Sequence, residues 1–170
     1  NERLGNLEEA EKSYQEAVKL DPTFGFAYLN LANVIYIKMM EESERAIDHE
    51  PNITRGDMED MPEKEMEYTI PDLQQAINYY NHALQIYPNL GFLYYNRANL
   101  YNKMQNYMAA IEDYDKAVSL QADMAEAYYN KGLTLLLLKD NEAACPNLSK
   151  AGELGIISSY NMIKRYCTKN

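Results

Sequence analysis

A motif of the form AxxxYxxA returns along the chain at a nearly constant interval, which limits the folds open to it. It begins at Ala10, Ala76, Ala110 and Ala144, with Leu148 in place of the tyrosine in the last copy. The last three copies are 34 residues apart, whereas the first two are separated by 66. A fixed period of this length is typical of stacked supersecondary units. The sequence therefore predicts a repeated 34-residue unit with a 32-residue insertion in one copy.

Within one unit the spacing is helical. Tyr94, Ala98 and Tyr101 lie at i, i+4 and i+7, on one face of a helix, and Ala110 and Tyr114 continue this spacing after a break at "MQNY". Each unit is therefore predicted to be a helical hairpin, with the aromatic residues on helix A and the alanines on helix B. Two helices approach to about 8–10 Å only where the crossing residue is small. We expect Ala98 at that crossing, where a leucine would overpack the contact by about 1–3 kcal/mol.

The order aromatic, small residue, alanine, aromatic, alanine and closing proline resembles the tetratricopeptide repeat family. Pro22 and Pro88 close two units, and Ala122 stands at that place in the next. The resemblance implies an all-α fold, a right-handed α-solenoid of helical hairpins. It implies a single array over residues 1–170, namely a helix B at 1–22, a repeat at 23–88 interrupted by the insertion 40–71, repeats at 89–122 and 123–155, and a capping helix at 156–170.

Three residues depart from the family pattern. Arg97 and Lys131 stand where the family usually has leucine. Pro146 lies inside the last helix B, where it removes an amide donor, so we expect that helix to start late or to bend. The chain also opens in the middle of a repeat. We therefore expect a piece of a longer protein, whose first apolar edge is open to self-association.

Charge and hydrophobicity exclude two classes of partner. The formal net charge is −10, whereas a nucleic-acid binder needs a basic face to displace counterions from phosphates. A bilayer span needs about 20 consecutive apolar residues, and "LTLLLL" is far shorter. We therefore predict no nucleic-acid binding and no membrane span.

The insertion 40–71 carries 11 acidic residues against three basic ones, which accounts for −8 of the net charge. One interpretation is a solvated excursion, in which helix A runs to about His49, Pro51 stops it and a short helix starts near Pro62. The other is an acidic docking surface for a basic partner. The sequence leaves both open.

No catalytic or metal-binding set can be assembled from the sequence. Neither His49 nor His82 has a second histidine or a cysteine at metal-ligand spacing, and the phosphate-loop and nucleophile-elbow motifs are absent. His82 is predicted to face solvent, and Glu112 and Asp113 are interpreted as solvated acids on an outer helix face. We therefore predict no enzymatic activity, no cofactor and no metal.

The resemblance implies that the A helices line a concave groove that binds an extended peptide or partner segment. The residues predicted to bind it are Phe26, Asn30, Asn33, Phe92, Tyr95, Asn96, Asn99, Lys103, Tyr129 and Asn130, with Leu29, Tyr36, Glu126 and Leu133 beside them. A side-chain amide has both a donor and an acceptor, so it can pair with a peptide main chain of any sequence.

Asn30, Asn96 and Asn130 occupy equivalent positions and resemble the asparagine ladder of the O-linked glucosamine transferase family. They do not resemble the carboxylate clamp of chaperone-binding members, whose cations are replaced here by Leu29, Glu126 and Asn130. We therefore predict no preference for a free acidic C-terminus. Two alternatives remain open. The ladder could hold neighbouring repeats together in a structural spacer, or the tyrosine- and amide-rich walls could bind a carbohydrate or another small molecule.

The last segment, "GIISSYNMIKRYCTKN", departs from the repeat and is amphipathic. Ile156, Tyr160, Ile163 and Cys167 share one face, which would cover the open end of the array. Cys145 and Cys167 are the only two cysteines, and a disulfide between them would hold this cap in place. Two buried free thiols are the alternative. The ending resembles tetratricopeptide repeat proteins exported by anaerobic Gram-negative bacteria, which implies an oxidising compartment, with the cytoplasm as the alternative.

Overall fold

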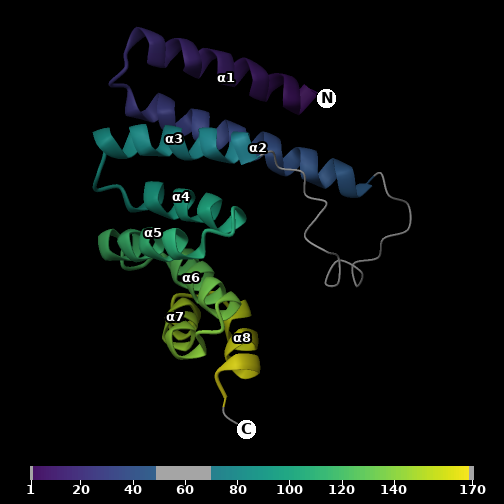
Figure 1. The fold of residues 1–170 in the computed structure, drawn as a ribbon, viewed down its shortest axis with the longest axis vertical. Coiled ribbons are helices and arrows are strands. Elements are labelled where there is room, and N and C mark those ends of the chain that lie inside the picture. Colours follow the sequence, from purple (N-terminus) through teal and green to yellow (C-terminus); the bar gives the residue numbers. More distant parts are fainter. Residues whose placement is uncertain (1, 49–69, 169–170) are drawn as a thin grey trace. The chain divides into compact units, whose positions relative to one another are not determined.

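The computed structural model describes residues 2–48 and 70–168, and all regular structure in these ranges is helical (Figure 1). The helices are α1 (Glu2–Leu20), α2 (Gly25–Asp48), α3 (Ile70–Ile86), α4 (Gly91–Lys103), α5 (Tyr107–Leu120), α6 (Ala125–Leu137), α7 (Asn141–Glu153) and α8 (Ser158–Tyr166). The predicted all-α class and the hairpin pattern are confirmed. The chain divides into two compact units, residues 1–83 and 84–170.

In the first unit, α1 packs against α2, and an ion pair between Lys38 and Glu11 joins them at 2.8 Å. The turn between these helices is held by Asp21, whose carboxylate accepts from the Thr23 hydroxyl at 2.6 Å and from the Thr23 backbone N–H at 2.9 Å. The hydroxyl bond first, and then the backbone bond, lower the pKa of the Asp21 carboxyl. The turn is therefore closed by a local side-chain interaction in place of a hydrophobic contact.

The expectation that helix A runs on to about His49 agrees with the structure, because α2 continues as one helix to Asp48. Residues 49–69 lie outside the described part of the chain. The short helix expected near Pro62 and both interpretations of the acidic segment fall there. After this segment, α3 begins at Ile70 and packs on α2 through a ring contact of His82 with Tyr28, whose centroids are 4.9 Å apart.

The second unit has its core where the A and B helices cross. Ala98 of α4 is fully buried among Ala110, Tyr114 and Ala117 of α5. In the next hairpin a Cβ atom built on Gly132 would lie 2.8 Å from the Cγ and Cδ2 atoms of Leu148. The prediction that a small residue stands at the crossing is confirmed for both hairpins of this unit, and at Gly132 there is no room for a longer side chain.

Pro146 was expected to make the last helix B start late or bend. The late start is wrong, because α7 begins at Asn141, and the bend stays a prediction. Asp140 fixes this start, since its side chain accepts from the Ala143 backbone N–H at 3.0 Å. In the turn that contains Pro146, the Asn147 side-chain amide donates to the Ala143 carbonyl at 2.8 Å. The cap at Asp140 therefore fixes the start of α7 upstream of the proline.

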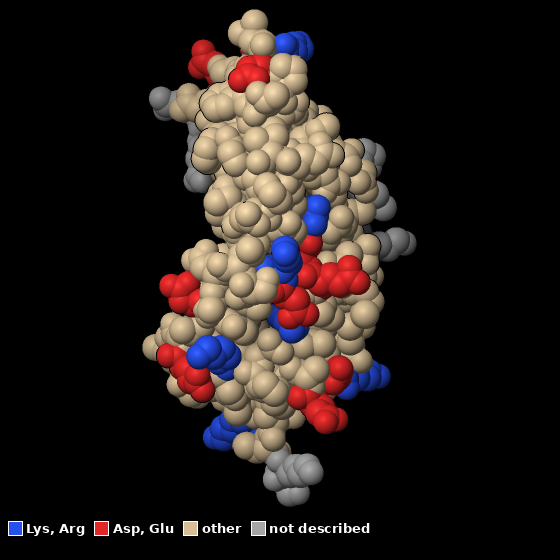
Figure 2. Space-filling model, turned by 90° about the vertical axis from the view of Figure 1, so that its left-hand side faces the viewer, with Lys and Arg blue, Asp and Glu red and all other residues tan. Residues whose placement is uncertain are grey.

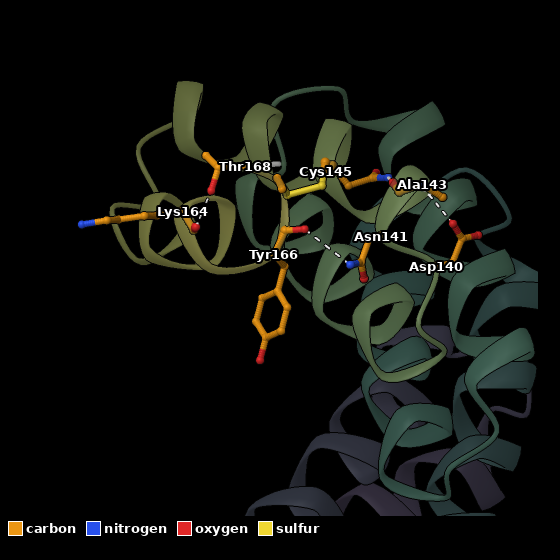
Figure 3. Close-up of a disulfide and its surroundings, with 9 residues drawn as sticks. Asp140, Asn141, Ala143, Cys145, Lys164, Tyr166 and Thr168 are labelled. Carbon is orange, nitrogen blue, oxygen red and sulfur yellow. Dashed lines mark hydrogen bonds between the residues drawn. A yellow bond between two sulfur atoms is a disulfide. The ribbon is translucent and has the colours of Figure 1, made fainter. Parts of the chain in front are cut away.

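The capping helix α8 packs on α7, and Cys145 of α7 is joined to Cys167 by a disulfide (Figure 3). Asn141 adds a hydrogen bond to the Tyr166 carbonyl at 3.4 Å. The covered face differs from the expected one. Ser159 is the fully buried residue of α8, whereas Tyr160 lies over Gly152 and remains 56% exposed.

Asp113 is not a solvated acid, which corrects the sequence interpretation. It is only 6% exposed, and its two carboxylate oxygens accept from Nε and Nη2 of Arg97, each at 2.7 Å. Burial lowers the pKa of the Arg97 guanidinium, but the hydrogen bonds and charge of Asp113 outweigh this and raise it. The guanidinium carbon also lies 5.6 and 5.8 Å from the ring centroids of Tyr94 and Tyr101. Arg97 replaces a leucine because it has a buried partner on helix B.

Replacing Arg97 by methionine should lower the free energy of unfolding by about 3 kcal/mol, because Asp113 is then a buried charge without its partner. The double variant Arg97→Leu with Asp113→Leu should recover most of this loss, since no unpaired charge remains. Urea denaturation of the three proteins measures both effects. If Arg97→Met were at least as stable as the double variant, the conclusion that Asp113 is buried and depends on its pairing with Arg97 would be wrong.

Candidate partner-binding site

The residues predicted to bind a partner fall on three A helices. Phe26, Asn30 and Asn33 lie on α2 in the first unit, whereas α4 carries Phe92, Tyr95, Asn96, Asn99 and Lys103 and α6 carries Tyr129 and Asn130. Phe26 is exposed and the others are half-buried, so all of them reach the surface. Leu29 does not, because it is 8% exposed and belongs to the core.

Two of the asparagines join helix A to helix B of their own hairpin. The Tyr80 hydroxyl donates to Asn33 Oδ1 at 2.5 Å, and the Tyr114 hydroxyl donates to Asn99 Oδ1 at 2.7 Å. In the last hairpin the equivalent residues are Leu133 and Leu148, so the polar pair is replaced on both helices at once. Asn33 and Asn99 therefore have a structural role, whatever else they bind.

Asn130 extends this bonding from α6 to α4. Its Nδ2 donates to Asn99 Oδ1 at 3.1 Å and to the Tyr95 hydroxyl at 3.3 Å. These bonds use the Asn130 donors and the Asn99 acceptor. Among the residues that the structure describes, they leave the Asn130 Oδ1 acceptor and the Asn99 Nδ2 donor for another molecule. The Tyr95 ring, 6.1 Å from the Tyr114 ring, also rests on the core. The site is thus a fixed set of amides on an ordered base.

Sequence reasoning missed Asn102, which lies one turn beyond Asn99 on α4. Its Oδ1 is buried without a hydrogen-bond donor among the described residues. The signal for it is the spacing of Asn96, Asn99 and Asn102, which follow one another at i, i+3 and i+6 along one face of the helix.

Other polar residues that the sequence analysis considered lie apart from these amides. His82 is exposed, as predicted, and Lys131 of α6 pairs with Asp115 of α5. Among the residues that the structure describes, no group of histidine, cysteine and acidic side chains could hold a metal ion. Figure 2 shows one face of the molecule, where basic and acidic side chains are interspersed. In the described ranges, no helix has both the length and the apolar character needed to cross a membrane.

Comparison with known families decides what these hairpins are. One tetratricopeptide repeat model matches residues 92–124, and a second matches residues 1–24 and 125–154, together just over half of the chain. The chain belongs to the tetratricopeptide repeat (TPR) family. The matched ranges begin and end close to the hairpins α4–α5 and α6–α7, so the family assignment and the fold agree.

Several curated proteins are similar in sequence to this TPR chain. It is 33% identical over 73 residues to a protein SGT1 homolog of Oryza sativa subsp. japonica. These 73 residues cover 43% of this chain and 20% of that protein. It is 25% identical over 157 residues to Hsp70-Hsp90 organizing protein 2 of Arabidopsis thaliana, covering 88% of this chain and 26% of that protein. The chain therefore spans about a quarter or less of these relatives.

Solved structures share the TPR fold at low sequence identity. The crystal structure of MamA superimposes with a TM-score of 0.69 at 18% identity, covering 92% of this chain and 74% of that one. The first TPR of Spaghetti (RPAP3), solved with the HSP90 peptide SRMEEVD, has a TM-score of 0.54 at 23% identity and covers 57% of this chain and 79% of that one. At these identities the likeness concerns the fold.

Replacing Tyr114 by phenylalanine should lower the free energy of unfolding by about 1 kcal/mol, because the half-buried amide of Asn99 loses a donor. The same change in a background of Asn99→Leu should cost clearly less, since the hydrogen bond is already gone. Chemical denaturation of the four proteins gives the coupling between the two residues. A coupling of zero would show that this hydrogen bond does not stabilise the hairpin.

Proposed function

We propose that this TPR chain is a protein-interaction module that binds an extended segment of a partner on its A helices. In the second unit the binding surface is the α4–α6 face, which comprises Phe92, Tyr95, Asn96, Asn99 and Lys103 of α4 and Glu126, Tyr129, Asn130 and Leu133 of α6. The observation that carries the proposal is the hydrogen bonding of Asn130 to Tyr95 and Asn99. It fixes one acceptor and one donor beside aromatic side chains.

These groups suit a peptide main chain. An extended segment offers N–H and C=O groups, which pair with the Asn130 acceptor and the Asn99 donor whatever the side chains are. Each such bond contributes about 1 kcal/mol net. Together with contacts to the aromatic walls, this corresponds to an affinity of roughly micromolar. The amides lose little freedom on binding, because the network already holds them.

The relatives are consistent with this proposal. One is named for Hsp70 and Hsp90, and the RPAP3 domain was solved with an HSP90 peptide. The residue chemistry differs from a site for acidic C-termini, because Glu126 and Asn130 stand where such a site would need cations. We therefore expect no preference of this chain for the peptide SRMEEVD.

Selection of peptides from a random display library tests the proposal. Binding of the selected peptides, measured by fluorescence anisotropy, should weaken by about tenfold in Asn130→Ala and in Asn96→Ala, because each loses main-chain hydrogen bonds. Asn161→Ala is the matched control, since Asn161 is an exposed amide on α8, and it should bind normally. Helicity by circular dichroism shows that each variant is folded.

Two outcomes would contradict the proposal. Selected peptides that bind all three variants equally would place the site elsewhere on the chain. Binding to a glycan array without any peptide binding would favour the carbohydrate alternative. If SRMEEVD binds and Asn96→Ala abolishes that binding, the expected lack of preference for acidic C-termini is wrong.

A further inference from the structure

The side chains on one stripe of α6 change in character from one end to the other. Glu126, Asn130, Leu133 and Leu137 follow at intervals of four, three and four residues, so they share one face of the helix. The hydrogen bonds of Asn130 to α4 show that this stripe adjoins the α4–α6 face. The stripe therefore runs from a carboxylate, through the fixed amide, to two leucines.

The leucine end is open to solvent. Leu137 is 61% exposed and Leu133 is half-buried beside it. A single exposed leucine is ordinary on a protein surface. Here the exposed leucine lies on the same stripe as Asn130, whose Oδ1 acceptor has no hydrogen bond among the described residues. One bound segment can therefore pack an apolar side chain on the leucine and hydrogen-bond its main chain to the amide.

The carboxylate end sets the charge of that segment. Glu126 is exposed, and an exposed carboxylate pairs with a basic side chain through charge-assisted hydrogen bonds. The cation of the α4–α6 face, Lys103, already has an interaction of its own. An exposed acid at one end and an exposed leucine at the other therefore fit a basic side chain and an aliphatic side chain.

The length of the stripe fixes the spacing of these two side chains. Glu126 and Leu137 are 11 residues apart. At a rise of about 1.5 Å per residue the stripe between them is roughly 16 Å long. An extended segment advances about 3.3 Å per residue, and its side chains alternate between two faces. Two side chains about four positions apart therefore share one face and cover most of this distance.

Building on the proposed function, we propose that the α4–α6 face selects partner segments in which a basic residue and an aliphatic residue stand about four positions apart. The basic side chain pairs with Glu126, the aliphatic side chain packs on Leu133 and Leu137, and the main chain between them bonds to Asn99 and Asn130. The amides accept either chain direction, so the side chains set the orientation.

The probes that test this are two capped peptides, Lys-Ser-Ser-Ser-Leu and its reverse, titrated into the full chain and followed by NMR chemical shifts. At least one should bind, and replacing its leucine by serine should weaken binding by about tenfold. Moving the leucine next to the lysine should have the same effect. Leu137→Ser should remove the preference for leucine, and Glu126→Lys should transfer the preference from the lysine peptide to the same peptide with glutamate.

Leu138→Ser and Glu112→Lys are the matched controls. Both residues are exposed and lie off this stripe, so neither variant should change the preferences. The inference is overturned if neither peptide binds at millimolar concentration, or if Glu126→Lys leaves the charge preference unchanged. If library peptides of another pattern still depend on Asn130, the proposed function stands without this specificity. If no peptide depends on Asn130, the proposed function fails as well.

Discussion

The close approach of helix A to helix B in each hairpin is the constraint on which the rest of the second unit depends. Ala98 is fully buried at one crossing, and Gly132 at the next lies so near Leu148 that a Cβ atom would overlap its side chain. Because interiors are packed at crystal-like density, a larger residue at either place would force the helices apart. The hydrogen bonds of Arg97 to Asp113, of Tyr114 to Asn99 and of Asn130 to Tyr95 span 2.7–3.3 Å, so they persist only while the helices keep this distance.

Two kinds of polar contact rely on that geometry. The Arg97 and Asp113 pair lies inside the α4–α5 hairpin, where burial makes the pair costly to break. The bonds among Tyr114, Asn99 and Asn130 begin in the same hairpin and end on α6. Hairpin packing thus orders the amides that we propose for partner binding. Asn99 has both roles, because it accepts the Tyr114 hydrogen bond within the hairpin and is proposed to donate to a partner.

Most of the fold could be predicted from the sequence, whereas the roles of individual polar residues could not. The period located every hairpin, since apolar spacing reports directly on which residues are buried. Asp113 was misread because a charge is usually solvated, and only its neighbour across the hairpin shows that it is paired. The late start expected from Pro146 was wrong because the side chain of Asp140 caps α7 upstream of the proline. The site residues on α4 and α6 were placed on the surface by register, but the bonding of Asn130 to Tyr95 and Asn99 depends on distances between helices that the period does not contain.

Side-chain amide NMR most directly tests whether this ordered network is the contact surface for a partner. A peptide selected for binding would be titrated into the isotopically labelled chain while the Nδ2 resonances of all asparagines are followed. The account predicts that Asn99 and Asn130 shift most, with little change at Asn106 and Asn161, which lie on other surfaces. Shifts confined to α5 and α7, with Asn99 and Asn130 unmoved at saturation, would contradict it.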